Sequence, residues 1–328
     1  MPGRTSASIG RNLLARFRRS PAPTLPPAES STEIAAHVRR IEIRARRLVA
    51  SIFLGEYHSV FRGRGIEFSE VRQYAPGDDV RAIDWNVTAR MGAPYVKQYI
   101  EERELQLLLL VDVSASAVLP ATGGSKRELA AQVAATLAFS AVANNDRVGL
   151  ITFSDRIETF VPPEKGRTHV LRIVRELLSA PSGGSGTDIG SALRYAARVS
   201  RRRSVIVVLS DFYGEGYEQQ LRAAALRHEV IALVLDDRRD AELPDVGLLE
   251  LQDAESGRRV LIDTSSFAVR EAYRRRAAAA VMRRRRALTA AGVEETVLHT
   301  GEPYVEPLLR AFRARRASRA ARHQARRR

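Results

Sequence analysis

The chain has 328 residues, 45% of them hydrophobic, and a formal net charge of +15 at pH 7. This length suffices for one sizeable hydrophobic core with a smaller module attached. The sequence contains no cysteine, which excludes disulfide bonds, thiolate nucleophiles and cysteine-ligated zinc. Its histidines are scattered, without the paired spacing of a histidine metal site.

The positive charge is concentrated in the two terminal segments. Residues 1–28 contain five arginines and residues 310–328 contain nine, with no acidic residue in either, so only +1 remains for the residues between them. We predict that residues 1–31, rich in Pro, Ser, Ala and Arg, form a disordered lead. Residues 310–328 are interpreted as an Arg-rich C-terminal tail. Basic runs are usually solvated, and the functional alternative is weak contact with nucleic acid or an anionic membrane.

No stretch approaches the roughly 20 consecutive apolar residues that a membrane span requires. Arg18 and Arg19 are followed by a proline-rich segment, where an export signal would have its hydrophobic region. We therefore expect a cytoplasmic protein, with peripheral attachment to the inner membrane surface through the basic tails as the alternative.

The first predicted element is an amphipathic helix over residues 32–51, where apolar residues recur at helical intervals between arginines. Residues 57–99 differ from it, with short β-like pieces, glycine-containing turns and many Arg, Asp and aromatic residues. We predict that residues 32–104 comprise this helix and a small β-rich module packed against the main domain. Arginine–carboxylate pairs would lock the module in place.

Within the module, Pro76 and Gly77 predict a turn. Asp78 or Asp79 is expected to stabilise this turn by a side-chain to backbone hydrogen bond. Trp85, the only tryptophan in the sequence, is the expected packing anchor of the module.

From Leu105 onward the pattern alternates between strands and helices, which predicts one α/β domain over residues 105–309. Strands are expected near residues 105–111, 147–153, 204–209, 229–235 and 294–298, with a shorter antiparallel strand near 157–161. Helices are expected near residues 126–143, 167–179, 188–200, 216–227 and 267–291. Residues 248–252 and 259–262 are expected to form a hairpin. Because the strands are almost continuously apolar, the sheet should be mostly parallel with helices on both faces.

Hydroxyl and carboxylate residues follow the predicted strands. Asp112, Ser114 and Ser116 come directly after the first strand, and Asp211 follows the strand over 204–209. Thr187 adds a hydroxyl from a glycine-rich loop. Hard oxygen ligands at the carboxyl ends of parallel strands are what a divalent cation requires, and a mixed hydroxyl and carboxylate shell suits Mg²⁺. Helix N-capping is the alternative role, because Ser and Asp are also the preferred caps.

The arrangement Asp-x-Ser-x-Ser, Thr and Asp resembles the von Willebrand factor A domain with its metal-ion-dependent adhesion site. That resemblance implies a Rossmann-type α/β fold and a site for Mg²⁺, or for Mn²⁺ or Ca²⁺, with one position left open for a carboxylate of the partner. It implies five ligands: Asp112, Ser114, Ser116, Thr187 and Asp211.

The upstream segment resembles the MoxR-associated domain-of-unknown-function family 58. The shared pattern comprises Glu67-Phe68, Arg72-x-Tyr74, Pro76-Gly77-Asp78-Asp79, Arg81-x-Ile83-Asp84-Trp85 and Ala89-Arg90. The similarity covers roughly residues 55–315. It implies partnership with a MoxR-type AAA+ ATPase in chaperone-like maturation of a client protein or metal insertion into it. Members of this family often carry transmembrane helices, which this sequence lacks.

Our leading hypothesis is therefore a non-enzymatic, metal-dependent adaptor that binds the ATPase and a client protein. A magnesium-dependent hydrolase with Asp112 as nucleophile is the first alternative, although no neighbouring general acid or base is evident and the third motif position is Ser114. A nucleic-acid or anionic-membrane binder acting through the basic tails is the second alternative.

Overall fold

The computed structural model describes residues 31–53, 57, 71–80, 83–97, 104–114, 124–180, 186–252 and 259–325. Its centre is a six-stranded sheet in the order β10-β7-β6-β3-β4-β5. The strands are β3 (Gln106–Asp112), β4 (Arg147–Phe153), β5 (Ile157–Glu164), β6 (Val205–Ser210), β7 (Glu229–Asp236) and β10 (Glu295–His299). All neighbours pair in parallel except β5, which is antiparallel to β4 at one edge.

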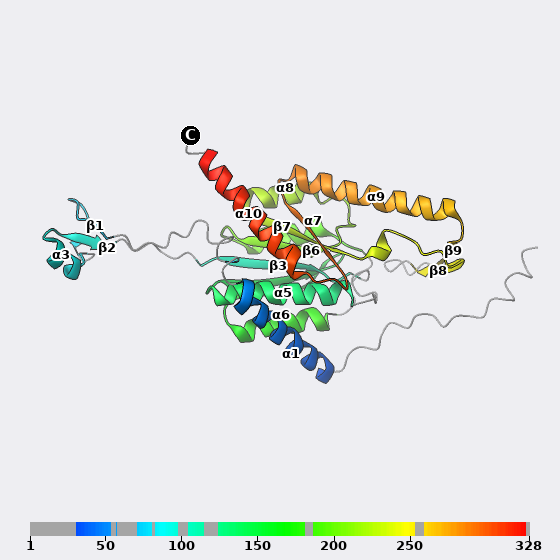
Figure 1. The fold of residues 1–328 in the computed structure, drawn as a ribbon, viewed down its shortest axis with the longest axis horizontal. Helices are drawn as coiled ribbons and strands as arrows, with labels where there is room; N and C mark the ends of the chain where they lie inside the picture. The colour runs from blue at the N-terminus through cyan, green and yellow to red at the C-terminus, as the bar shows by residue number, and fades with distance from the viewer. Residues whose placement is uncertain are drawn as a thin grey trace, which may run out of the picture.

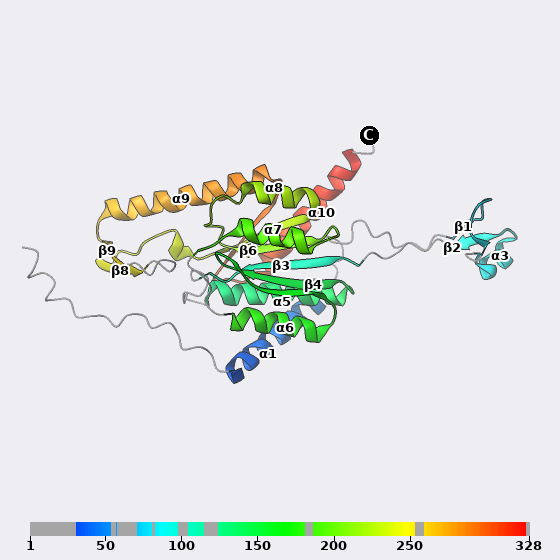
Figure 2. The ribbon, with the colours of Figure 1, turned by 180° about the vertical axis from the view of Figure 1, so that it is seen from behind.

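Helices cover both faces of this sheet (Figures 1 and 2). The helices are α1 (Ser31–Leu48), α5 (Lys126–Ala143), α6 (Arg167–Ser179), α7 (Ile189–Val199), α8 (Glu218–Arg227), α9 (Phe267–Ala290) and α10 (Val305–Ala325). Helices α1, α5, α6 and α10 share one core with alternate residues of β3, including Leu107 and Leu109. Helices α7, α8 and α9 share the other core with Leu108 and Leu110. The predicted three-layer α/β fold is confirmed.

From β3 onward the strands and helices lie close to the predicted residues, except that β5, predicted as a shorter strand near 157–161, extends to Glu164. Strand β4 and helices α5 and α6 begin and end at the predicted residues. The run Leu107–Leu110 is fully buried because each face of β3 contacts a helical layer, and this explains why the sequence there is continuously apolar.

The two ends of the described chain meet on the same face of the sheet. After α1 the chain makes a π-helical turn, η1 (Val49–Phe53), and Phe53 contacts Phe312 of α10 edge-to-face with ring centroids 6.1 Å apart. The proposed disordered lead lies outside the described residues, apart from Ser31 at the start of α1. The proposed basic tail begins inside α10, and its Phe312 is buried in the core.

The segment upstream of the sheet contains β1 (Val71–Gln73), α3 (Trp85–Met91) and β2 (Tyr95–Lys97), with β1 antiparallel to β2. The predicted turn forms at Gly77, which has a φ of 109°. Asp78 stabilises it, accepting a hydrogen bond of 2.9 Å from the Ala75 N–H and a bidentate pair from Arg72. The expectation for Trp85 was wrong: its side chain is 67% exposed at the start of α3 and does not anchor a core.

A hairpin of β8 (Leu248–Gln252) and β9 (Arg259–Asp263) precedes α9, as predicted. A short 3₁₀ turn, η3 (Arg238–Asp240), follows β7 at the same edge of the sheet as the candidate site. The described helices include no segment with the length and hydropathy of a membrane span.

Candidate metal site at the carboxyl edge of the sheet

The candidate site lies where the strand order reverses. Strands β3 and β6 are adjacent and parallel, and their registered pairs run to Val111 opposite Leu209. The chain leaves β3 toward α5 on one face and leaves β6 toward α8 on the other. Doubly wound sheets bind their ligands beyond the carboxyl ends of the strands at such a reversal. Asp112 ends β3 and Asp211 directly follows β6.

Asp112 is held rigidly at this reversal point. Its side chain is buried, with the residue only 2% exposed. One carboxylate oxygen, Oδ1, accepts a hydrogen bond of 3.0 Å from the Ser114 N–H, and Oδ2 accepts one of 2.7 Å from the Ser210 hydroxyl. Burial and, after it, the nearby negative charge of Asp211 together raise the pKa of Asp112 to about 6. The site therefore favours a cation.

Asp211 contacts a cation that belongs to the protein itself. Its Oδ2 lies 2.8 Å from Nζ of Lys126, the first residue of α5, while its Oδ1 accepts a hydrogen bond of 3.2 Å from the Tyr213 N–H. The same Nζ lies 2.7 Å from Oδ2 of Asp240 in η3. Burial alone would lower the pKa of Lys126, but the two carboxylates outweigh it and raise that pKa above its ordinary value.

Thr187 reaches the same edge from the segment before α7. A Cβ added at Gly214 would lie 2.8 Å from the carbonyl oxygen of Thr187, so the Thr187 backbone packs directly on the loop that follows Asp211. The next residue, Asp188, donates its N–H to the Ser154 carbonyl at 2.7 Å and caps α7. The structure thus brings Asp112, Ser114, Asp211 and the Thr187 segment to one edge. Ser116 lies outside the described residues.

Helix capping does not account for Asp112 and Ser114. The N-cap of α5 is Ser125, whose hydroxyl accepts a hydrogen bond of 3.1 Å from the Glu128 N–H. Capping does explain Asp188, whose side chain accepts hydrogen bonds from the N–H and the hydroxyl of Ser191. The two oxygens of the Asp112 carboxylate accept hydrogen bonds from the turn after β3 and from Ser210 of β6.

The donor set is suited to a hard divalent cation. Asp112 and Asp211 supply carboxylate oxygens and Ser114 a buried hydroxyl, the ligand types that Mg²⁺ accepts. In the part of the chain that the structure describes, no group of three or more His, Asp or Glu side chains forms a metal site. The ammonium of Lys126 on Asp211 shows that a positive charge fits this position. Sequence reasoning missed Lys126 and Asp240; the one available signal was a lysine at a helix start in an arginine-rich chain.

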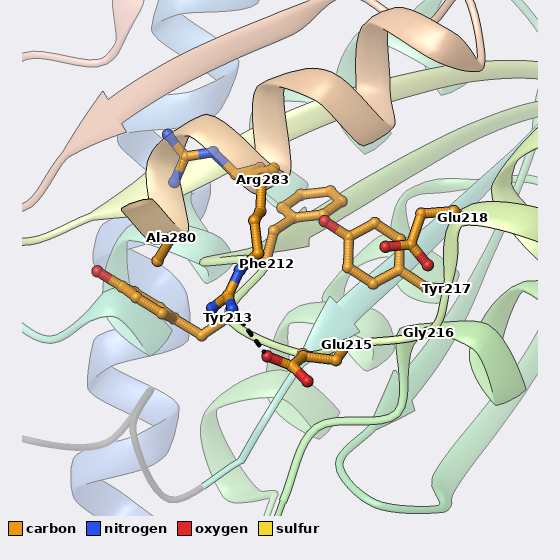
Figure 3. A pocket seen from close by; sticks show the side chains of 10 residues that line it. Phe212, Tyr213, Glu215, Gly216, Tyr217, Glu218, Ala280 and Arg283 are labelled. Atoms are coloured by element: carbon orange, nitrogen blue, oxygen red, sulfur yellow. Dashed lines mark ion pairs between the residues drawn. The ribbon is translucent and has the colours of Figure 1, made fainter. Parts of the chain in front are cut away.

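A cavity of about 250 Å³ lies beside the loop that follows Asp211, and Tyr213 is one of the residues that line it. It lies between the loop after β6 and the C-terminal half of α9 (Figure 3). An ion pair of 3.1 Å between Glu215 and Arg283 crosses it, and the buried Arg284 beside it pairs with Glu295 at 2.8 Å. Helix α9 is therefore linked by charge to the loop that carries Asp211.

Comparison with known proteins identifies relatives along most of the chain. The family model described as "Protein of unknown function DUF58" matches residues 70–283. The uncharacterized protein Rv1480 of Mycobacterium tuberculosis is 37% identical over 317 residues, which cover 93% of this chain and 99% of that protein. The uncharacterized protein YeaD of Bacillus subtilis is 26% identical over 175 residues, 53% of this chain and 41% of that protein.

Two solved structures are similar at low sequence identity. The conserved hypothetical protein BatB from Bacteroides thetaiotaomicron is 18% identical with a TM-score of 0.42, over 65% of this chain and 99% of that one. The SpRpn10 VWA domain is 12% identical with a TM-score of 0.36, over 63% of this chain and 93% of that one.

Proposed function

Because the chain belongs to the DUF58 family of proteins of unknown function, we propose that it is a non-enzymatic adaptor whose binding to a partner protein depends on a divalent cation. Asp112, Ser114 and Asp211 would hold the ion, with Thr187 and Ser116 completing the set. The ion, when bound, supplies an open coordination position for a carboxylate of the partner.

One observation carries this proposal: two carboxylates, Asp112 and Asp211, lie buried and close together where β3 and β6 end. Burial, and after it the repulsion between these two negative charges, raises the pKa of Asp112. A bound cation would relieve the repulsion. The hydrogen bonds from Ser114 and Ser210 hold Asp112 as an acceptor in a fixed orientation, which suits an ion ligand.

The partner we propose is a MoxR-type AAA+ ATPase, acting with this protein on a client. The proposal rests on the similarity of the segment around Arg72 and Asp84 to the MoxR-associated family. A carboxylate of the ATPase or of the client would reach the ion at the sheet edge. Exposed ion pairs contribute little to affinity, so the contact must exclude water to matter.

The test is complex formation between the purified protein and the MoxR-type ATPase of the same organism. It is measured by biolayer interferometry at fixed concentrations of Mg²⁺ and nucleotide. The ATPase itself requires Mg²⁺, so a chelator would remove the metal from both proteins. The test therefore uses substitutions in this protein. We expect Asp112→Ala and Asp211→Asn to weaken the complex by about tenfold or more, which is roughly 1.4 kcal/mol.

Asp245→Ala is the matched control, because Asp245 is an exposed aspartate that forms an ion pair with Arg270. This variant should bind the ATPase as the wild type does. Wild-type affinity in Asp112→Ala and Asp211→Asn, with both variants folded, would contradict the metal-dependent contact.

A further inference from the structure

Lys126 occupies an unusual place for a lysine. It is the first residue of α5, where the helix dipole disfavours positive charge. Its side chain is only 8% exposed, although a buried ammonium is costly unless it is paired. Two carboxylates together compensate the buried charge, because Nζ lies 2.8 Å from Asp211 and 2.7 Å from Asp240. The burial of Lys126 thus depends on acids from two other segments.

The two partners of Lys126 differ in their surroundings. The side chain of Asp211 is 5% exposed and lies beside Asp112 at the candidate metal site, whereas that of Asp240 is 35% exposed on η3. Asp211 is therefore a carboxylate that both Lys126 and a divalent ion would use, while Asp240 is available to Lys126 from the solvent side.

We propose that Lys126 is a tethered counter-cation that competes with the divalent ion for Asp211, and that Asp240 is the partner it keeps when the ion binds. This inference rests on the proposed function, since it concerns the same site. The flexible four-carbon stem of lysine allows such a shift, which a rigid guanidinium would not follow as easily.

The geometry gives the proposal opposite predictions for two substitutions. Without the ammonium, Asp211 is free of its competitor, so Lys126→Met should bind Mg²⁺ more tightly. Without the Asp240 carboxylate, Lys126 loses the partner that it would keep when the ion binds and stays on Asp211, so Asp240→Asn should bind Mg²⁺ more weakly. We expect changes of about tenfold in each direction, because close charge pairs in a buried site interact strongly.

The experiment is isothermal titration of the metal-free protein with Mg²⁺ alone, for the wild type, Lys126→Met, Asp240→Asn and Asp112→Ala. Lys165→Met is the matched control: Lys165 also pairs with a carboxylate, Glu104 at 2.5 Å, but Glu104 precedes β3 at the opposite edge of the sheet. Lys165→Met removes one positive charge, as Lys126→Met does, and should leave the affinity for Mg²⁺ unchanged.

Lys126→Met is expected to melt at a lower temperature without Mg²⁺, because it removes the ammonium that compensates the buried charge of Asp211. Lys126→Arg keeps the charge and serves as the second variant if Lys126→Met does not fold. It should bind Mg²⁺ no more tightly than the wild type, whereas tighter binding by Lys126→Arg would overturn the competition.

The outcomes separate this inference from the proposed function. Equal or weaker Mg²⁺ binding by Lys126→Met, with binding abolished in Asp112→Ala, would overturn the competition and leave the metal site standing. Tight binding by Lys126→Met that survives the addition of Asp112→Ala would place the ion elsewhere and overturn the inference. Absence of Mg²⁺ binding in every variant would overturn both, whereas binding in Lys126→Met but not in the wild type would support both.

Discussion

Asp112 is the residue at which we expect the pH to affect both the stability of the fold and the proposed metal binding. It is buried at the end of β3, and burial together with Asp211 raises its pKa from 3.8 to about 6. The folded protein therefore binds a proton at Asp112 more tightly than the unfolded chain does. By linkage, the stability that this proton supplies is present at low pH and is lost as the pH rises through the folded pKa.

The pH dependence of stability tests this directly. In metal-free protein, we expect the Asp112 contribution to the free energy of unfolding to fall between about pH 4 and pH 6 and then to level off. The measurement is urea unfolding at a series of pH values, comparing the wild type with Asp112→Asn. The variant should gain stability relative to the wild type as the pH rises over this range. A constant difference between the two would contradict the raised pKa.

The affinity for Mg²⁺ should depend on the protonation state of Asp112. A carboxylate must be ionised to hold a cation, so Mg²⁺ competes with the proton on Asp112. We expect the affinity for Mg²⁺ to decline as the pH falls below about 6, the pKa of Asp112. Titration calorimetry at several pH values, in buffers of different ionisation enthalpy, would show proton release on binding. Binding without proton release at pH 5.5 would argue against Asp112 as a ligand.

At the scale of elements, the site depends on two loops that pack against each other. Gly214 follows Asp211, and its Cα faces the carbonyl oxygen of Thr187 so closely that a Cβ would lie 2.8 Å from it. Because the obstructing atom belongs to the backbone, it cannot rotate away. The absence of a side chain at Gly214 therefore lets the Thr187 segment approach the Asp211 loop.

Gly214→Ala should push these loops apart and weaken Mg²⁺ binding several-fold, with little loss of secondary structure. Gly186→Ala is the control, because a Cβ there would meet only the Asp155 Cβ at an ordinary distance of 3.8 Å. Calorimetric titration of both variants decides the matter. Equal affinities in the two would mean that the Thr187 segment does not contribute to the site.

The sequence allowed most elements to be predicted because their signals are local. The apolar runs of Leu107–Leu110 and α5 and the helical periodicity of α6 report burial directly. The pairing of Lys126 was not predictable in this way, since Asp211 lies 85 residues later in the sequence and only the fold brings the two together. The prediction for Trp85 used residue type alone. A large aromatic residue usually anchors a core, but Trp85 is exposed.

At the scale of the whole molecule, the N-terminal and C-terminal helices complete one hydrophobic core. Phe312 of α10 is 2% exposed and contacts Phe53 just after α1, on the same face of the sheet as α5. Arg315, one turn further along α10, pairs with Glu229 at 2.8 Å. Part of the basic C-terminal segment therefore belongs to the folded body, and Arg315 has a structural role there.

Phe312→Ala should lower the free energy of unfolding by about 3–5 kcal/mol, the usual cost of removing a buried phenylalanine. Phe267→Ala is the matched control, because Phe267 at the start of α9 is 71% exposed and should be close to neutral. Denaturant unfolding monitored by circular dichroism gives both values. A small loss for Phe312→Ala would mean that α10 is not packed on the sheet domain.

At the same scale, the proposed function requires a divalent cation to bind where β3 and β6 end. The most direct test is a crystal structure of the protein in Mn²⁺, with the ion located by its anomalous scattering. We expect one anomalous peak bordered by Asp112, Ser114 and Asp211, with Nζ of Lys126 on Asp240 and away from Asp211. A structure in saturating Mn²⁺ with no peak at this edge and with Lys126 still paired to Asp211 would contradict the proposed function.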